Sequence, residues 1–261
     1  MEKLSVVIIT FNEAHRIKRC IDSVLEIADE IVVVDSFSTD DTIAIAKSLG
    51  ANVIQEKFRG YVEQKNFALT MAKEDWILSL DADEAIDDTL KNEIKTIKKQ
   101  DLKTTVFQIN RFNCYCGKWI NHGAWNPDLK IRIFKSNTGK WEGLNPHDRF
   151  QPKAEVHIEK LKGQILHWSY DSVEGHREKI QKFALIGAEA YFKAGKKAYA
   201  WQTIFSPLVR FFRDYFLKAG ILDGKEGFII AWLTAKEVRL KYQYLRELNT
   251  RSTIQQKSQR L

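Results

Sequence analysis

Short apolar runs alternate with stretches of helical periodicity through the first hundred residues. The apolar runs have the length of strands buried on both faces, and they lie at residues 4–10, 31–34, 52–54 and 76–80. Each is followed by a stretch that suits a helix, at residues 17–25, 39–49, 61–73 and 88–99. Because the connections are too long for hairpins, the alternation predicts a mostly parallel sheet with right-handed crossovers and helices on both faces.

Short polar side chains are expected to cap three of these helices. Asn12 precedes the first helix and Ser38 or Thr39 the second, and each can accept hydrogen bonds from the free N–H groups of a first turn. Asp87 and Asp88 can do the same for the fourth helix and place favourable negative charge at its N-terminus. The acids that precede Asp87 are therefore left without a capping role.

The carboxyl ends of the four predicted strands all turn polar. In chain order, the residues at these ends are Thr10, Phe11, Asn12 and Glu13; Asp35 and Ser36; Glu56 and Lys57; and Asp81 and Asp83. Ligands of open parallel sheets bind beyond this edge, so these residues predict a site for a base, a ribose and a metal bound to phosphate. The chain has neither Gly-x-Gly-x-x-Gly nor Gly-x-x-x-x-Gly-Lys-[Ser/Thr], which excludes a dinucleotide fingerprint and a P-loop.

Two acids in WILSLDADEAIDDTL, residues 76–90, indicate a metal site. On an extended backbone Asp81 and Asp83 point to the same side, where two carboxylates repel each other unless a cation lies between them. Mg²⁺ or Mn²⁺ is held in this way by one or two carboxylates while substrate phosphates complete its shell. The alternative is a pair of solvated loop acids.

The pattern changes after residue 104. Two further strands are expected, at residues 104–112 and 130–134, and Trp119, Trp125 and Trp141 are interleaved with Asn and Gly around them. Flat aromatic rings beside polar groups are a common way to hold a sugar, and they are also ordinary packing. Both interpretations stay open.

A candidate general base lies in WEGLNPHDRF, residues 141–150. Asp148 follows Pro146 and His147, and a carboxylate or imidazole there could take a proton from an incoming hydroxyl. A loop ion pair between Asp148 and Arg149 would explain the same residues without any catalytic role.

Composition places the chain among ordinary globular proteins. It has 261 residues, of which 44% are hydrophobic and 29% charged, enough for one large domain or a domain with an appendage. Three cysteines make no disulfide framework and Cys114-x-Cys116 lacks zinc-site spacing, so a reducing cytosol is expected. The N-terminal MEKLSVVIITFNE is expected to form a strand and not a signal peptide, and no run of 18 apolar residues occurs.

Positive charge is concentrated in the C-terminal part. Residues 1–150 hold 21 Lys and Arg against 23 Asp and Glu, whereas residues 151–261 hold 20 against 11. Such an excess suggests an anionic partner, either a membrane or a nucleic acid, or a solvated face that keeps the protein soluble.

The C-terminal third is predicted to be mainly helical. Residues 174–194 suit a long helix that ends at Gly195. FSPLVRFFRDYFLKAGIL, residues 205–222, mixes aromatic and aliphatic side chains with Arg and Lys, as does a helix that lies in a membrane interface. Packing onto the catalytic domain or onto a second protomer is the alternative. Residues 249–261 are expected to be a disordered tail.

The strand-end motifs resemble those of the family 2 glycosyltransferases, inverting enzymes with the Rossmann-like nucleotide-diphospho-sugar transferase (GT-A) fold. The matching pieces are SVVIITFNE, EIVVVDSFSTDDT, KNFAL from Lys65 and WILSLDADE, which cover roughly the first 90 residues. WEGLNPHDRF, GQILHWSY and FLKAGILDGKEGF look like a bacterial branch, the lipopolysaccharide inner-core β-1,4-glucosyltransferases, which adds glucose or a related hexose.

The resemblance implies roles for residues of the donor site. The base and ribose pocket would be lined by Thr10, Phe11, Asn12, Glu13 and Asp35. Lys65 would lie near the nucleotide. Asp81 would contact the ribose or the metal, and Asp83 would ligate the Mg²⁺ or Mn²⁺ that bridges the diphosphate.

The resemblance also implies that Asp148 is the general base. Many relatives have His-Glu where this chain has His147-Asp148, so the shorter carboxylate must reach the acceptor by a different backbone placement. Asp171 and Glu142 are the alternative bases.

The implied organisation is a GT-A catalytic domain at residues 1–170 followed by a helical, basic C-terminal extension at residues 171–248. Within the catalytic domain, residues 1–100 would form the nucleotide-binding half and residues 101–170 the acceptor half. The predicted tail at residues 249–261 completes the chain.

The expected activity is metal-dependent transfer of a hexose, with inversion, from a nucleotide sugar such as UDP-glucose. The acceptor would be a hydroxyl of a lipid-linked oligosaccharide, the lipopolysaccharide inner core, reached from the cytoplasm or from the cytosolic face of the inner membrane by peripheral contact with anionic lipid. One alternative is a nucleotidyltransferase of related fold, which would release pyrophosphate. The other, a basic nucleic-acid-binding protein, is opposed by the near-neutral first 150 residues, so no nucleic acid is expected as a partner.

Overall fold

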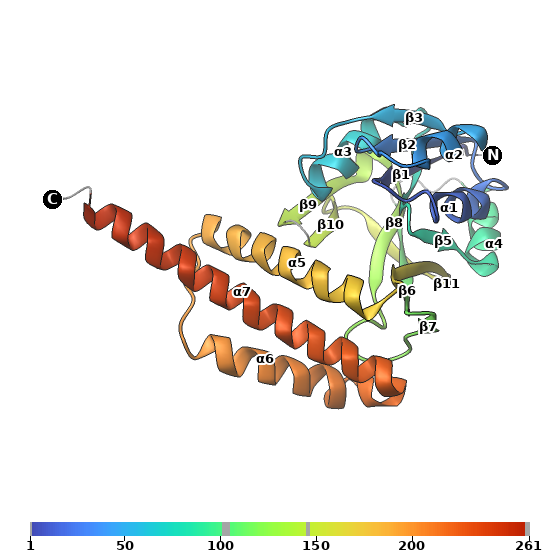
Figure 1. The fold of residues 1–261 in the computed structure, drawn as a ribbon. Helices are drawn as coiled ribbons and strands as arrows, with labels where there is room; N and C mark the ends of the chain where they lie inside the picture. The colour runs from blue at the N-terminus through green and yellow to red at the C-terminus, as the bar shows by residue number, and fades with distance from the viewer. Residues whose placement is uncertain (1, 101–104, 145–146, 259–261) are drawn as a thin grey trace. The chain divides into compact units, whose positions relative to one another are not determined.

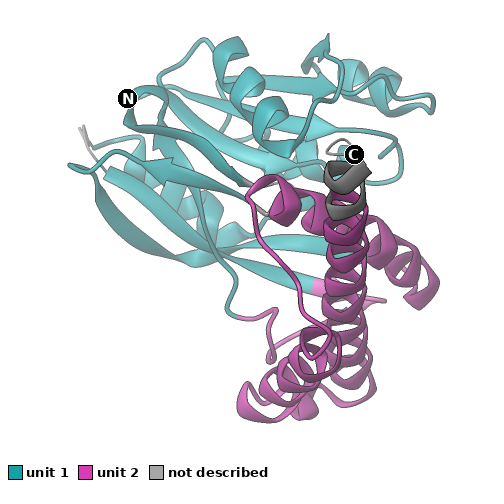
Figure 2. Ribbon diagram, turned by 90° about the vertical axis from the view of Figure 1, so that its left-hand side faces the viewer, with its two compact units in different colours: residues 1–113, 127–143, 147–169 teal, residues 114–126, 144–146, 170–261 magenta. Residues whose placement is uncertain are grey.

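The computed structural model describes residues 2–100, 105–144 and 147–258. The chain forms two compact units, coloured separately in Figure 2. Unit 1 comprises residues 1–113, 127–143 and 147–169, and unit 2 comprises residues 114–126, 144–146 and 170–261. The limits predicted for the folding domains, at residues 170 and 248, stay predictions.

Unit 1 begins with alternating strands and helices and continues with strands (Figure 1). Its alternating part contains β1 (Leu4–Thr10), α1 (Ile17–Val24), β2 (Glu30–Asp35), α2 (Thr42–Ser48), β3 (Asn52–Gln55), α3 (Tyr61–Met71), β4 (Trp76–Asp81), β5 (Glu84–Ile86) and α4 (Asp88–Ile97). The later strands are β6 (Thr105–Tyr115), β8 (Leu129–Lys135), β9 (Gly139–Leu144), β10 (His147–Pro152) and β11 (His157–Tyr170), with a 3₁₀ turn at Ser136–Thr138. β6 and β11 end in unit 2, where β7 (Lys118–Trp119) pairs with the last residues of β6.

One mixed sheet organises unit 1. The strand order is β3-β2-β1-β4-β8-β6-β11-β5. The strands β3, β2, β1 and β4 are parallel, as the helix between each strand and the next requires. β8 runs antiparallel to both β4 and β6, and β5 runs antiparallel to β11. β9 and β10 form a separate two-stranded sheet.

Helices cover both faces of the parallel strands. Val6 and Ile8 of β1 belong to a core cluster that includes the apolar sides of α1 and α4. Val7, which points the other way, packs in a second cluster with Ala68 of α3. Full burial of one such valine or isoleucine contributes about 1.5–3 kcal/mol to folding. The arrangement confirms the predicted α/β fold class with a mostly parallel sheet, helices and a C-terminal helical part.

Strand register brings the carboxyl ends of the parallel strands to one edge. Thr10, the last residue of β1, lies opposite Asp35 of β2, and Ile9 lies opposite Asp81 of β4. The polar residues that follow β1, β2 and β4 therefore start from neighbouring positions.

Unit 2 is mostly helical. Its elements are α5 (Val173–Lys193), α6 (Gln202–Phe212), a π-helical turn (Arg213–Leu217), a 3₁₀ turn (Gly220–Asp223) and α7 (Gly224–Ser258), and α7 packs against both α5 and α6. Ser172 caps α5, because its hydroxyl accepts a hydrogen bond from the Gly175 N–H. In the described part of the chain, no helix combines the length and the apolar character that crossing a bilayer requires.

Two predicted helix caps are wrong. α1 begins after Arg16 and α2 after Asp41, and neither N-cap residue makes a side-chain capping bond. Asn12 and Ser38 instead connect the loops after β1 and β2. The predicted cap of α4 is confirmed, since the Asp87 carboxylate accepts a hydrogen bond from the Leu90 N–H.

The structure also differs from the predicted tail. α7 continues to Ser258, and residues 259–261 lie outside the described residues. Residues 249–258 contain neither Gly nor Pro, so nothing in their sequence ends the preceding helix.

Candidate functional site

The loops after β1 and β2 are joined by hydrogen bonds between side chains and backbone. The Asn12 N–H donates to Ser38 Oγ at 2.8 Å, and the Thr39 N–H donates to Asn12 Oδ1 at 2.8 Å. Asn12 has a φ of 54°, a left-handed conformation that Asn tolerates better than most residues. The first two strand ends therefore form one fixed wall, in which Phe11 is 55% exposed and Glu13 pairs with Arg16 at 3.2 Å.

Thr10 and Asp35 lie buried behind this wall. The Asp35 carboxylate accepts hydrogen bonds from the N–H and the hydroxyl of Ser38. The buried Thr10 hydroxyl has no hydrogen-bond partner among the described residues. Leaving a buried hydroxyl unpaired costs about 1–3 kcal/mol, which a ligand that supplied the missing partner would recover.

Lys65 of α3 joins two acids from distant parts of the sequence. Its ammonium lies 3.1 Å from Asp81 Oδ1 and 2.8 Å from Asp148 Oδ2, and its side chain is 3% exposed. The ammonium also lies 4.6 Å from the ring centroid of Trp141. Asp148 therefore pairs with Lys65, and the described residues show no ion pair between Asp148 and Arg149.

A second buried cation supports Asp81 from the other side. The Arg132 guanidinium, 2% exposed, lies 3.2 Å from Asp81 Oδ2 and 2.8 Å from Glu84 Oε1. Glu84 in turn accepts a hydrogen bond from the Asp81 N–H at 2.9 Å. Arg111 lies 3.5 Å from Glu84 and 2.7 Å from Asp128. The cluster alternates acids and cations, which offsets much of the cost of burying them.

These contacts fix the charge state of Asp81. Burial alone would raise the pKa of this carboxyl, but Lys65, Arg132 and Arg111 together lower the pKa well below its ordinary value. Asp81 is therefore a carboxylate at neutral pH, with its charge already shared by two cations.

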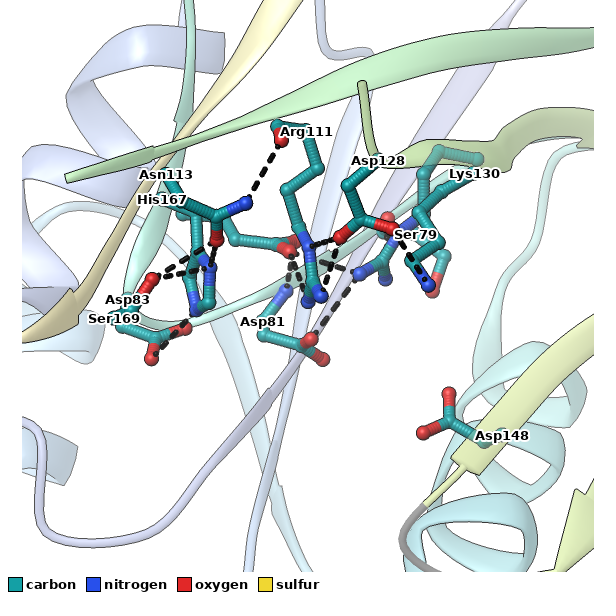
Figure 3. Close-up of polar contacts among 12 residues, drawn as sticks. Ser79, Asp81, Asp83, Arg111, Asn113, Asp128, Lys130, Asp148, His167 and Ser169 are labelled. Carbon is teal, nitrogen blue, oxygen red and sulfur yellow. Dashed lines mark hydrogen bonds and ion pairs between the residues drawn. The ribbon is translucent and has the colours of Figure 1, made fainter. Parts of the chain in front are cut away.

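Asp83 lies in a separate polar network with His167 of β11 (Figure 3). His167 Nε2 is 3.3 Å from Asp83 Oδ2, and His167 Nδ1 is 2.7 Å from Asn113 Oδ1. The Ser169 hydroxyl donates to the same Asn113 oxygen at 2.9 Å. Burial alone would raise the pKa of Asp83, but the neighbouring His167 more than offsets this, and the pKa lies below its ordinary value. In the view of Figure 3, Asp148 lies on the side of Asp81 away from this network.

Asp83 and His167 fit a divalent cation. The Asn113 amide donates to the Arg111 carbonyl at 3.1 Å, which turns its oxygen toward His167. An amide oxygen only accepts, so His167 Nδ1 carries a proton and a neutral ring would turn the Nε2 lone pair toward the Asp83 carboxylate. Two electron-rich atoms 3.3 Å apart need a proton or a metal ion between them. Among the described residues no three His, Cys, Asp or Glu side chains form a ready-made metal site, so water or substrate phosphate would have to complete the shell.

Of the two alternative bases, one belongs to unit 1 and the other to unit 2. Glu142 of β9 pairs with Lys140 at 3.0 Å and is partly exposed. Asp171 belongs to unit 2, just before α5.

Several site residues were not predicted from the sequence. They are Glu84, Arg111, Asn113, Arg132 and His167. Arg132 had a detectable signal, because a charged residue in the middle of KIRIF, a strand otherwise apolar at its centre, requires a buried partner. His167 and Ser169 occupy alternate positions of one strand and so share a face, but nothing in the sequence points this face at Asp83.

Comparisons with known proteins find a family and relatives that match most of this chain. Residues 5–159 match the model of the family described as Glycosyl transferase family 2. An uncharacterized glycosyltransferase of Rickettsia typhi is 34% identical over 97% of this chain and 89% of its own length. The lipopolysaccharide core biosynthesis glycosyltransferase LpsC of Rhizobium meliloti is 27% identical over 90% of this chain and 91% of its own length. Among solved structures, S. aureus TarS is 19% identical, with a TM-score of 0.46 over 94% of this chain and 54% of its own.

The family match spans more than half of the chain and contains Asp35, Lys65, Asp81, Asp83 and Asp148. The Rickettsia relative extends the likeness to almost the whole length. The chain therefore belongs to glycosyl transferase family 2, and it is a glycosyltransferase.

Proposed function

We propose that the enzyme transfers a hexose, with glucose from UDP-glucose as the expected donor, to a hydroxyl of the lipopolysaccharide inner core. The observation that carries the proposal is the shared ion pair of Lys65. It holds Asp148 next to Asp81, so that a carboxylate able to accept a proton and the acids of the donor side lie at one place.

The donor side would bind the nucleotide sugar. Thr10 and Asp35 offer buried polar groups to the base and ribose, and the unpaired Thr10 hydroxyl supports this assignment. Asp83 and His167 would hold Mg²⁺ or Mn²⁺, which when bound supplies positive charge to the leaving diphosphate. Lys65 and Arg132 keep Asp81 ionised beside them.

The acceptor side would supply the base. Asp148 would take the proton of the attacking hydroxyl while the oxygen approaches the anomeric carbon from the face opposite the leaving group. One displacement of this kind inverts the configuration. General-base assistance contributes about 10²- to 10⁴-fold to such a step.

The proposed acceptor class is supported by one of the relatives. LpsC is named for lipopolysaccharide core biosynthesis and aligns with 90% of this chain. A core oligosaccharide is attached to lipid, so peripheral binding at the cytosolic face of the inner membrane belongs to the same proposal.

A thermal-shift panel tests the donor assignment. The purified chain is heated with UDP-, GDP-, CDP- and ADP-sugars and with the four nucleoside triphosphates, each with Mn²⁺ or with EDTA. A ligand at 100 times its Kd adds about 2.7 kcal/mol to stability. We expect a shift with UDP-glucose that requires Mn²⁺ and is lost in a Thr10→Val, Asp83→Asn double variant.

Other outcomes of the panel would contradict the proposal. Shifts confined to triphosphates would indicate a nucleotidyltransferase. A metal-dependent shift with a different diphospho-sugar would replace the donor and keep the reaction class.

A further inference from the structure

Unit 2 exposes a large apolar surface. Twelve of the nineteen exposed large apolar side chains in the described residues lie between positions 201 and 232. They come from α6, the turns that follow it and the first part of α7, and the most exposed are Leu208, Val209, Leu217 and Leu222, at 61–72%. We call these twelve side chains the apolar face.

Aromatic contacts connect the parts of the apolar face. The Phe212 ring lies 5.2 Å from that of Phe216, which joins α6 to the π-helical turn. Phe211 lies 6.5 Å from Phe216 and 6.3 Å from Trp232, which joins both to α7. Trp232 stacks on Phe228. The aromatic members of the apolar face are therefore connected from α6 to α7, and exposed apolar surfaces of this kind mark binding sites.

The exposed charges of the segment that carries most of the apolar face are positive. Between residues 199 and 222, all of them described, the only acid is Asp214, which is 2% exposed and ion-paired with Arg210 and Arg213. The next acid along the chain, Asp223, is 3% exposed and accepts a hydrogen bond from the His122 N–H. Arg213 and Lys218, by contrast, are exposed.

Glu226 follows Asp223 and is also engaged, because it pairs with Lys118 at 3.0 Å. The face thus combines apolar side chains with exposed cations, while its carboxylates are buried or paired. This pattern is complementary to a partner whose interior is apolar and whose outer layer carries negative charge.

We infer that the apolar face inserts into the headgroup region of a bilayer that contains anionic phospholipid. Phenylalanine, tryptophan and leucine side chains would enter the boundary of the acyl chains, and Arg213 and Lys218 would reach lipid phosphates. A second copy of the chain fits less well. A two-fold interface would place the exposed cations of both copies, among them Lys218, on one shared surface whose nearby carboxylates are already buried or paired.

The inference deepens the proposed function, because a lipid-linked acceptor lies in the same membrane. It rests on different residues, however, and lipid binding is measured without donor or acceptor. The two proposals can therefore fail independently.

Co-flotation with liposomes tests the inference. The full chain is mixed with vesicles of phosphatidylcholine alone or of phosphatidylcholine with phosphatidylglycerol, at low and high salt. We expect binding to the anionic vesicles that weakens with salt. A Leu208→Ser, Leu217→Ser double variant should bind at least about tenfold more weakly.

The matched control is Leu25→Ser with Leu185→Ser, which changes two exposed leucines outside the apolar face. It should float like the parent. Absence of flotation at low salt, or equal losses in both double variants, would overturn the inference. So would a dimer in sedimentation that the Leu208, Leu217 variant dissociates, because the face would then belong to a second copy.

The donor thermal shift, measured on the same preparations, separates the two proposals. A donor shift without flotation overturns the membrane inference and the peripheral location proposed with it, and it leaves the proposed donor and reaction in place. Flotation with an unchanged melting temperature across the donor panel supports the inference and contradicts the proposed function.

Discussion

At the scale of single residues, the contact between Asp83 and His167 depends on what lies between them. Asn113 holds the proton on His167 Nδ1, so Nε2 either carries a second proton or shares a metal ion with the carboxylate. The two possibilities predict different behaviour for a variant of the imidazole.

His167→Gln removes the nitrogen that faces Asp83 and keeps a polar side chain of similar size. If the pair holds a cation, affinity for Mn²⁺ in the presence of UDP should fall about 10- to 100-fold, as measured by calorimetric titration. Ser169→Ala is the control, because Ser169 bonds Asn113 and lies 3.1 Å from His167 Nδ1, so its loss leaves the Nε2 atom that faces Asp83 in place. Equal Mn²⁺ affinity in His167→Gln and the parent would mean that the contact is only a protonated ion pair.

Asp148→Asn tests the base. The amide keeps the shape of the side chain but cannot accept the acceptor's proton, so kcat should fall about 10²- to 10⁴-fold. Donor affinity should be retained, because Lys65 still pairs with Asp81. Glu142→Gln, at a carboxylate outside the cluster, should turn over like the parent. If Asp148→Asn keeps the parental kcat and Glu142→Gln loses activity, Glu142 is the general base and Asp148 is not.

At the scale of elements, the first hundred residues were predictable because their structure is encoded locally. A buried parallel strand needs a continuous apolar run, and the helices between strands need an apolar stripe. β1 covers the residues predicted for it, and Asp87 caps α4, as its position before the first periodic leucine indicated.

The cap of α4 gives a stability prediction. Asp87→Ala removes the acceptor for the Leu90 N–H and should cost about 1 kcal/mol, within a range of about 0.5–2 kcal/mol. Asp88→Ala is a close control, because Asp88 is one residue along, almost fully exposed, and only pairs with Lys91 on the surface. Its cost should be below about 0.5 kcal/mol. Urea unfolding measures both, and equal losses would show that charge near the helix end matters more than the cap.

The remaining features depend on contacts between distant segments. Asn is a common helix N-cap, yet Asn12 forms hydrogen bonds with Ser38 and Thr39 in the loop after β2. A hydrogen bond between distant segments therefore replaces the capping bond that local sequence favoured. The carboxylate pair expected at Asp81 and Asp83 is divided, since Asp81 is held by Lys65 and Arg132 and Asp83 faces the network of His167. Strand alternation shows which residues share a face, but it does not show which other strand that face will meet.

At the scale of the whole molecule, ionisable groups in both units make stability depend on acid pH. In unit 1, Asp81, Asp83 and Asp128 have pKa values below the ordinary value because cationic neighbours outweigh burial. An unfolded chain binds protons on these carboxyls at higher pH than the folded chain does. Their contribution to stability is therefore present above about pH 4 and is lost as the pH falls further.

In unit 2 the relevant group is a histidine. His176 is 2% exposed, lies 3.1 Å from the Tyr115 hydroxyl and stacks on the Tyr170 ring. Burial, with a smaller effect of Lys179, lowers the pKa of His176 to about 4 from an ordinary 6.5. The unfolded chain thus binds a proton that the folded chain excludes between these two values. The contribution of neutral His176 is complete above pH 6.5 and is lost as the pH falls toward 4.

His176→Gln isolates this contribution. Urea unfolding at pH 7, 6 and 5 should show that the parent loses up to about 1.4 kcal/mol per pH unit through this group. The variant starts from a lower stability, because the ring packing is gone, but its pH slope should be shallower by that amount. His157→Gln, at an exposed position of β11, should keep the parental slope. The carboxylates of unit 1 affect stability at lower pH, so they do not obscure this comparison. Parallel pH slopes of the unfolding free energy for the parent and His176→Gln would show that folded His176 takes up a proton. That result would contradict burial as the cause of its lowered pKa.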